Sequence, residues 1–431
     1  MRLKSACIVF LFLQTVWCLK PTIVWHTKRL YPHLTDPQNI HCGNVTCIST
    51  RKREISGNGK YVAYLFYGTD LEAEDLPLPR SDDDVWALIH EESPMNNYLF
   101  SHAAGIKLFN LTSTFRRESD YPLTTQFIPS LEYLTERMAV PLEEKNRLRR
   151  EGLSPLLYVQ SHCSVASDRD RYVKELSNYI PIDSYGSCLN NATLPSDLAT
   201  TDKYESEKFL QFISKYKFHL AFENAICDDY MTEKLFRALH VGSVPVYKGS
   251  SVVRDWMPDE NSVVVVDDFD SPVDLANYLM KLDRSDEEYN SFLEFKRTKA
   301  VKNEMLRRVI ESREWGINDI NKIDVFQGFE CFVCQKMVDF VINQQKCFAG
   351  GDCKEISYVA NKNHMGCPQP RPSLETKLEM NDKWVQESWV DSYWYGLDLA
   401  KAIHKMIEAR EKKSSRINKY LMSMKCLQRV L

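Results

Sequence analysis

Hydrophobic residues in this chain are grouped in short runs that alternate with longer amphipathic stretches. Several runs of six to eight residues are apolar and rich in aromatic or β-branched side chains, which is typical of buried strands. They are Tyr61–Gly68, Val85–His90, Pro155–Ser161, Lys217–Phe222, Ser243–Gly249 and Ser262–Asp268. Helical spacing of apolar residues predicts helices at Pro141–Gly152, Asp168–Ile180, Thr232–Gly242 and Ser271–Asp283. Because strands and helices alternate, we predict an α/β fold with parallel sheets.

The alternation falls into two halves, so we predict two Rossmann-like, doubly wound domains with a cleft between them. The expected first domain is residues 21–150 and the second is residues 151–327. Residues 328–370 are predicted to form a loop-rich segment that contains Cys331, Cys334, Cys347, Cys353 and Cys367. Residues 371–431 are predicted to form a helical tail, in which Leu397–Lys413 is one amphipathic helix.

The N-terminus has the pattern of a secretory signal. Arg2 and Lys4 precede a mostly apolar run, Ala6–Cys18, that is shorter than the roughly 17–25 residues of a membrane-spanning helix. Residues 1–20 are therefore expected to be a signal peptide or a short signal anchor, which would make the chain a type II membrane protein. Thirteen cysteines also favour an oxidising lumen. Three N-glycosylation sequons begin at Asn44, Asn110 and Asn191.

Charge restricts the partners. The formal net charge is −4 and the pI is near 6.2, which argues against nucleic acid as the main partner. No G-x-G-x-x-G follows a predicted strand, and no P-loop motif is present. A dinucleotide-dependent dehydrogenase or a P-loop enzyme is therefore disfavoured.

The stretch "AFENAICDDYMTEKLFRALHVG", from Ala221 to Gly242, places many charges where a strand ends and a helix begins. Ligands of open α/β sheets bind beyond the carboxyl ends of the strands, and a helix N-terminus attracts phosphate. Lys234 suits a diphosphate there, and Glu233 suits sugar hydroxyls. An exposed Glu–Lys pair on a helix surface is the alternative interpretation. Asp228 and Asp229 are expected to shape the loop.

Other polar clusters have simpler explanations. Asp82-Asp83-Asp84 precedes a strand and is interpreted as a solvated turn, and Asp268-Phe269-Asp270 is followed at once by a helix cap at Ser271. Cys331-x-x-Cys334 with Cys347 and Cys353 loosely resembles zinc spacing, but disulfides are favoured in a lumen. Cys163 and Cys188 flank one predicted helix and are candidates to pair. The histidines are interpreted as structural; the ones considered are His26, His90, His102 and His219.

The stretch from Ala221 to Gly249, followed by "VVVVDDFDSPVDLANYLMKLD", closely resembles the donor-binding signature of the α1,3-fucosyltransferases, glycosyltransferase family 10. "FNLTSTFRRESD" (Phe109–Asp120) is similar to a second family motif, and the resemblance spans roughly Pro21 to Cys334. "HEESPMNNY", "PLTTQ" and "SHCSVASDRDRYVKEL" look like the family's divergent branch. That branch is assigned as protein O-fucosyltransferases of the endoplasmic reticulum that act on EMI domains.

The resemblance implies a GT-B fold and inverting transfer from GDP-β-L-fucose. Its donor-binding positions fall on Asn224, Tyr230, Glu233 and Lys234, and less directly on Arg169. The family usually has Asn where this chain has His162, so the chain departs from the family pattern at that strand end. No obligatory metal or other cofactor is implied, because Lys234, Arg169 and the helix N-terminus can balance the diphosphate.

Inverting transfer needs one base to deprotonate the acceptor hydroxyl. The family's base, a Glu just before a proline-containing turn, falls on Glu92 of "IHEESP". Glu91 is adjacent and would point the other way if the strand persists. Asp70, also at a strand end, is the main rival.

The acceptor remains open between a Ser or Thr hydroxyl of a folded protein domain, which the branch motifs favour, and the 3-hydroxyl of GlcNAc in an N-glycan. An inactive glycan-binding or chaperone module is a third hypothesis. The resemblance also favours the endoplasmic reticulum over the Golgi. It further implies that Cys42 and Cys47 are bridged to Cys331 and Cys334, while local pairing of Cys42 with Cys47 is the alternative.

Overall fold

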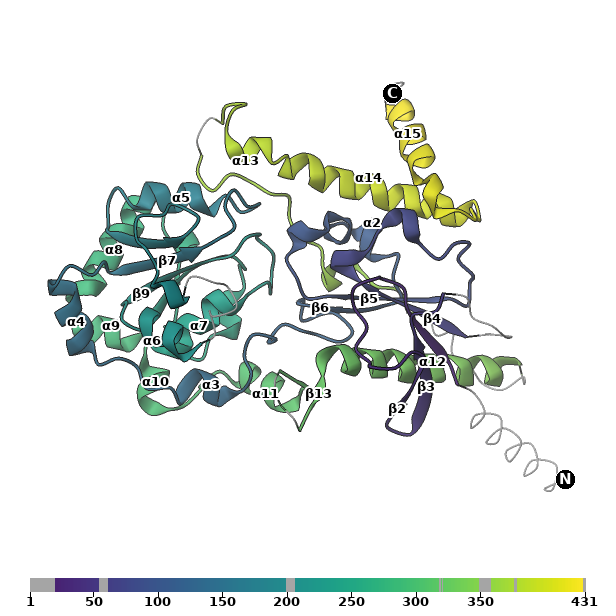
Figure 1. Ribbon diagram of the computed structural model, residues 1–431, viewed down its shortest axis with the longest axis horizontal. Helices are drawn as coiled ribbons and strands as arrows, with labels where there is room; N and C mark the ends of the chain where they lie inside the picture. The colour runs from purple at the N-terminus through teal and green to yellow at the C-terminus, as the bar shows by residue number, and fades with distance from the viewer. Residues whose placement is uncertain are drawn as a thin grey trace.

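The structure of the chain is a computed structural model that describes residues 20–53, 61–198, 206–317, 319, 321–348, 358–375 and 378–428. Almost all of the predicted signal or anchor segment, residues 1–19, lies outside them, as does Cys353. Two α/β domains lie side by side, and a long helix of the C-terminal tail runs along the one that is formed by the N-terminal part of the chain (Figure 1).

The first domain is built on a six-stranded sheet of order β2-β3-β1-β4-β5-β6, in which β2 alone is antiparallel to its neighbour. Its strands are β1 (Thr22–Trp25), β2 (Gln38–Cys42), β3 (Val45–Thr50), β4 (Val62–Tyr67), β5 (Val85–His90) and β6 (Leu111–Thr114). Every residue of β5 is buried, as its apolar run predicted.

The second domain has a five-stranded sheet of order β11-β10-β9-β7-β8, all parallel. Its strands are β7 (Leu156–Gln160), β8 (Ile182–Gly186), β9 (Phe218–Phe222), β10 (Val244–Lys248) and β11 (Val264–Val265). The predicted strand Ser262–Asp268 is wrong in length, because a 3₁₀ turn (Val266–Asp268) follows β11 directly at the sheet edge. The mixed α/β class and the two parallel-sheet domains confirm the predicted GT-B-like fold.

Helices pack around this second sheet where the sequence signals placed them. They include α5 (Arg169–Leu176), α7 (Glu233–Val241) and α8 (Pro272–Arg284). The Ser271 side chain caps α8 by accepting from the Asp274 amide. Shorter helices of the two domains are α2 (Ala103–Ile106), α3 (Leu131–Thr135), α4 (Leu142–Arg150), α6 (Glu207–Ile213), α9 (Asp286–Ser291), α10 (Glu294–Thr298) and α11 (Glu304–Ser312). β12 (Trp315–Gly316) and β13 (Ile323–Asp324) form a separate two-stranded sheet.

The boundary between the domains lies earlier than the predicted break after residue 150. Ile128 and Leu134 are fully buried in the core of the second domain. Lys145 of α4 is buried there too, and its Nζ donates to the carbonyl oxygens of Tyr216 at 3.0 Å and Gly242 at 2.8 Å. α4 has a charged surface, but its one inward lysine anchors the helix to the second domain.

The prediction of a loop-rich segment after residue 327 is wrong for its first part. Val325–Phe348 forms one long helix, α12, which packs against β2, β3, β4 and β5. Phe329, Val333 and Met337 are buried at four-residue spacing, so one face of the helix covers the first sheet. The density of cysteines hid this helical pattern.

Disulfides attach α12 to the first sheet and the tail to the second domain. Cys42 pairs with Cys331 and Cys47 with Cys334, the pairing that the family resemblance implied, and the local alternative is not formed. Cys163 pairs with Cys188. A fourth bridge, Cys227–Cys367, was not predicted.

The C-terminal tail folds back over the first domain. It contains α13 (Lys383–Gln386), α14 (Trp389–Glu408) and α15 (Ile417–Gln428). The predicted helix Leu397–Lys413 therefore begins earlier and ends at Glu408. Gly396 lets α14 approach closely, because a Cβ there would lie 2.6 Å from the backbone of Tyr98. The start of the tail also reaches the second domain, where Arg171 pairs with Asp382 at 2.8 Å.

Of the three sequons, Asn44 is the best placed to carry a glycan. It is exposed in the two-residue turn between β2 and β3, after Gly43 with its positive φ of 64°. Asn110 is a poor candidate, because its amide donates to the Tyr358 carbonyl oxygen and its Oδ1 accepts from Trp86 and Arg80.

Asn191 is exposed, but its side-chain amide is hydrogen-bonded to the backbone of β8, where it accepts from the Ser184 amide and donates to the Ile182 carbonyl oxygen.

We expect site-specific mass spectrometry of the protein from a eukaryotic secretory host to find Asn44 glycosylated and Asn110 not glycosylated. A glycan on Asn110 would contradict this.

Candidate functional site

A cleft of about 590 Å³ opens on the second domain, beyond the carboxyl ends of β7 and β9. Its walls come from the second domain, from the segment that enters that domain and from the segment that leaves it. The lining residues are Gln126, Phe127, Pro129, Tyr133, Val159, Gln160, Ser161, His162, Arg169, Asn224, Glu233, Lys234, Arg237 and Ile317. Four of the predicted site residues are thus brought together: Arg169, Asn224, Glu233 and Lys234. Three permanently cationic side chains face one carboxylate in this lining, which suits a dianionic or more highly charged ligand.

The N-terminus of α7 lies at this cleft and is fixed by a buried carboxylate. Thr232 caps the helix, and Glu223, at the end of β9, accepts from the Thr232 amide at 2.7 Å and from its hydroxyl at 2.8 Å. Burial raises the pKa of Glu223. Gly242, with a φ of 71°, ends the helix in the left-handed region. The hydrogen bonds between Glu223 and Thr232 therefore fix the end of β9 to the start of α7, so that the first turn of α7 lies at the cleft.

Lys234 lies in the first turn of α7 among oxygen atoms. Its Nζ is 3.0 Å from Thr232 Oγ1, 3.3 Å from Glu233 Oε1 and 3.6 Å from Glu223 Oε2. Burial acts to raise the pKa of Glu233, but the nearby Lys234 and Arg237 outweigh it and lower that pKa. Glu233 is therefore an acceptor of hydrogen bonds, and its side chain is 36% exposed towards the cleft.

Arg169, the first residue of α5, is buried and is one of the residues that line the cleft. It donates to the carbonyl oxygens of Phe222 and His162, each at 2.9 Å. Its Nε is buried and has no hydrogen-bond partner among the described residues. A buried donor without an acceptor is costly, so this group indicates a place for a ligand oxygen.

Asn224 and Tyr230 connect the cleft of the second domain to side chains of the first domain. The Tyr230 hydroxyl donates to Asn224 Oδ1 at 3.1 Å, and its ring packs on Phe115 with centroids 5.0 Å apart. Burial raises the pKa of Tyr230, and Ser93 of the first domain lies close enough to its hydroxyl to act against that rise. The predicted residue Tyr230 therefore acts on the cleft through Asn224.

Glu91 and Glu92 follow β5 directly, next to Ser93. Glu92 is exposed, and no hydrogen bond or ion pair of its carboxylate is found within the described part of the chain. Glu92 is not among the residues that line the cleft, but its neighbours reach that cleft. The Glu91 carbonyl oxygen accepts from Gln126 Nε2 at 3.0 Å, and Gln126 is a lining residue.

Asp70, the rival to Glu92, lies elsewhere. It borders a small cavity of about 10 Å³ together with His26 and Asp75. Its Oδ1 is 3.6 Å from an Arg29 guanidinium nitrogen. This position is outside the cleft that Arg169 and Lys234 line.

Asp228 and Asp229 join the two domains, which goes beyond the loop-shaping role that the sequence predicted. Buried Asp229 accepts from Arg117 at 2.6 Å and from the Trp256 indole at 2.8 Å. Asp228 lies 3.3 Å from Arg116 and accepts from the Ser251 hydroxyl. Arg116 and Arg117 belong to the "FRRESD" motif of the first domain, so two separate motifs meet here as one set of ion pairs.

Sequence reasoning missed several further lining residues, among them Arg237 and Tyr133, and a pattern could have found the first of these. Arg237 follows Lys234 by three residues, which places both on one face of α7. Tyr133 comes from α3, which sequence reasoning assigned to the first domain. Its ring stacks on His240 at 3.9 Å.

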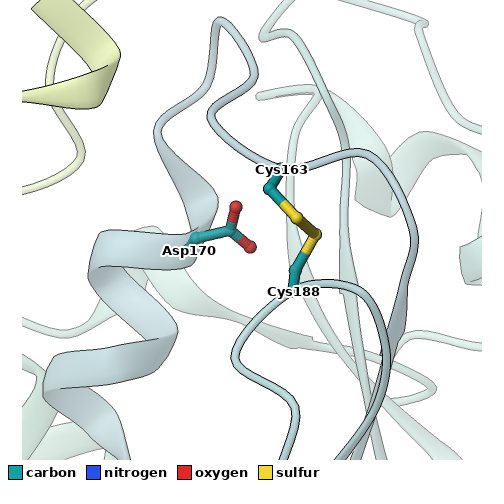
Figure 2. A group of neighbouring side chains, drawn as sticks. All are labelled: Cys163, Asp170 and Cys188. Atoms are coloured by element: carbon teal, nitrogen blue, oxygen red, sulfur yellow. A yellow bond between two sulfur atoms is a disulfide. The ribbon is translucent and has the colours of Figure 1, made fainter.

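Among the described residues, one group of three possible metal ligands has its ligand atoms within 4.8 Å of one another: Cys163, Asp170 and Cys188. Figure 2 shows that the two sulfur atoms are joined in a disulfide beside the Asp170 carboxylate. Asp170 also accepts from the Tyr158 hydroxyl at 2.7 Å. Because the two sulfur atoms are in a disulfide, the Asp170 carboxylate is the one remaining ligand of this group for a cation, and it already accepts a hydrogen bond. Two other acidic sites are held by basic side chains or the backbone: Asp268 pairs with Arg254, and Asp84 accepts from the Ser81 amide.

Comparison with known proteins decides the family. Residues 19–125 match the model "Fucosyltransferase, N-terminal", and residues 150–340 match "Glycosyltransferase family 10 (fucosyltransferase) C-term". The chain belongs to glycosyltransferase family 10. This fucosyltransferase is 41% identical over 371 residues to the GDP-fucose protein O-fucosyltransferase 3 of Bos taurus, which covers 86% of this chain and 76% of the relative.

The Homo sapiens protein of the same name is also 41% identical to this fucosyltransferase, over 376 residues, with 87% and 77% covered. A solved structure described as "Crystal Structure of alpha1,3-Fucosyltransferase with GDP-fucose" covers 73% of this chain and 83% of its own, at 15% identity and a TM-score of 0.35. That likeness is too weak to bear on the site.

The disulfides indicate that this fucosyltransferase works in the lumen of the secretory pathway. None of its helices in the described ranges combines the length and the apolar character that a membrane crossing requires.

Proposed function

We propose that the enzyme transfers L-fucose from GDP-β-L-fucose, with inversion to an α linkage, to a Ser or Thr hydroxyl of a folded protein domain. The cation-lined cleft at the start of α7 supports the donor. The 41% identity to proteins named GDP-fucose protein O-fucosyltransferase 3 supports the protein acceptor. An EMI-type domain is the acceptor class that the sequence motifs favour.

The proposed donor contacts follow from the geometry of the cleft. Lys234, Arg169 and the N-terminal amides of α7 bind the diphosphate and stabilise the charge that develops as GDP leaves. Glu233 accepts hydrogen bonds from sugar or ribose hydroxyls. Asn224, oriented by Tyr230, presents its amide to the donor. Because these groups supply positive charge from the protein itself, we expect no obligatory metal or other cofactor.

The proposed base is Glu92. Inversion requires the acceptor hydroxyl to attack the face of the sugar opposite GDP, so the base and the diphosphate-binding groups must approach the sugar from opposite sides. Glu92 follows β5 of the first domain, whereas Lys234 and Arg169 belong to the second. Ser93, next to Glu92, lies close enough to the Tyr230 hydroxyl to influence its pKa, so the two domains approach each other here.

The competing acceptor is the 3-hydroxyl of GlcNAc in an N-glycan, and the competing class is an inactive glycan-binding module. We would offer the purified lumenal chain labelled GDP-fucose with a folded EMI-type domain and, separately, with a GlcNAc-terminated N-glycan. Label on the protein hydroxyl is expected. Label on the glycan alone would contradict a protein acceptor, and failure to bind GDP-fucose would contradict both activities.

Within the secretory pathway, we propose the endoplasmic reticulum, where newly folded domains are available as acceptors. We also propose attachment to the membrane through residues 1–20 if that segment is not cleaved. Fractionation of cells that express the full chain, with carbonate extraction, would test both proposals.

The Lys234→Met variant should bind GDP about ten- to one-hundredfold more weakly, because a hydrogen bond to a charged group contributes about 1.5–3 kcal/mol. Isothermal titration with GDP would measure this. Lys248→Met is a matched control, since Lys248 pairs with Asp267 at the end of β10 and does not line the cleft. Equal affinities in the two variants would contradict the assignment of Lys234.

A further inference from the structure

Glu91 has no part in the proposed reaction, although it precedes the proposed base. Its Oε1 accepts from the Tyr67 hydroxyl at 2.9 Å, which joins the end of β5 to the end of β4. Its backbone oxygen accepts from Gln126, a residue that lines the donor cleft. Its Oε2 is buried and has no hydrogen-bond partner among the described residues. Glu91 therefore links two strand ends and the wall of the cleft.

The surroundings of Glu91 disfavour a negative charge. Burial raises the pKa of Glu91 to about 7, the hydrogen bond from Tyr67 acts against this rise, and the charge of Glu92 adds to it. Glu92 and Tyr67 are the titratable side chains that act on Glu91 in the described structure, and no cationic side chain balances it there. Phe326 of α12 packs on the Tyr67 ring and contributes no charge. A carboxylate with one buried, unbonded oxygen would be costly in this place.

We propose that Glu91 is a positioning residue that must be protonated for fucosyl transfer, so that Glu92 is the only anion at the carboxyl end of β5. In the neutral acid, Oε1 accepts from Tyr67 and the proton is on Oε2. Loss of that proton would place two anions on consecutive residues. The ionised Oε2 would then turn towards water while Oε1 keeps the hydrogen bond from Tyr67, and this movement would displace the backbone that carries Glu92 and holds Gln126. This inference rests on the proposed function.

The test is the pH dependence of kcat/KM for transfer to the acceptor that the wild-type enzyme uses. We expect the wild-type value to fall above about pH 7 and to be about tenfold lower at about pH 8. Glu91→Gln has nearly the same shape and stays neutral, so its kcat/KM should remain within about twofold over the same range.

A second variant moves the profile in a known direction. The Tyr67 hydrogen bond favours ionised Glu91, so Tyr67→Phe should raise the pKa of Glu91 and shift the alkaline fall to higher pH. Tyr64→Phe is the matched control, because Tyr64 lies on the same strand and its ring is next to His26. Its profile should match that of the wild type.

If the alkaline fall of kcat/KM persists in Glu91→Gln, or if this variant loses transfer uniformly at every pH, this inference is wrong. The proposed function is unaffected by either result as long as the wild-type enzyme transfers fucose. GDP affinity, measured for each variant, shows that its donor site is intact. If the wild-type enzyme transfers fucose to neither acceptor, the proposed function fails and this inference fails with it.

Discussion

Replacing Glu92 with glutamine should lower kcat for fucosyl transfer by about one hundred- to ten thousandfold, while GDP-fucose still binds. Glutamine keeps the size of the side chain but cannot accept the proton of the acceptor hydroxyl. Glu92 is exposed and outside the donor cleft, so its loss should not disturb the groups that hold the diphosphate. Single-turnover transfer of labelled fucose, together with GDP-fucose titration, would measure the two effects separately.

Asp70→Asn is the natural control, because Asp70 was the rival base and lies in a separate small cavity. We expect it to transfer fucose at a rate within a few fold of the wild type. If Glu92→Gln retains transfer and Asp70→Asn loses it, the assignment of the base is wrong.

Replacing Asp229 with alanine should destabilise the enzyme by about 3–5 kcal/mol, because it leaves a partly buried guanidinium and an indole N–H without their shared acceptor. Arg117 donates to Asp229 through Nε at 2.9 Å and through Nη2 at 2.6 Å. The Trp256 indole donates to the same carboxylate at 2.8 Å. Since Arg117 belongs to the first domain and Trp256 to the second, the loss should also loosen the interface between the domains.

Thermal unfolding would show this as a fall of the midpoint by about 10 °C. Asp228→Ala is the matched control one residue earlier in the same loop. The Asp228 side chain is 45% exposed, so its removal should change the midpoint by about 1 or 2 °C, as expected for surface ion pairs. Equal effects of the two substitutions would contradict the role given to Asp229.

The sequence predicted elements whose signals are local. α7 carries its own start at Thr232 and its own end at Gly242, and α8 has a cap at Ser271, so both were placed within about a residue. Lys234, Glu233 and Asn224 were then assigned to one site because a strand end and a helix start are adjacent along the chain. Arg169 joined them through the family motif, and the cleft contains all four.

Features that depend on distant partners could not be predicted in this way. Nothing near Asp229 reveals that its partner is Arg117, which lies on the other domain. α4 has a charged surface typical of a linker, and only the burial of Lys145 assigns it to the second domain. The apolar face of α12 is interrupted by cysteines that are typical of disulfide-rich loops, so its helical spacing is hard to recognise in the sequence.

The bridge between Cys227 and Cys367 sets a lower limit on the size of a working enzyme. The family models end at residue 340, and a chain cut there would still contain both sheets and every predicted donor-binding residue. It would, however, leave Cys227 as a buried thiol in the loop that carries Asn224, and it would uncover the surface beside Tyr98 on which α14 packs. The minimal catalytic fragment is therefore defined by the tail, and shortened forms prepared for crystallisation or inhibitor screening should retain it.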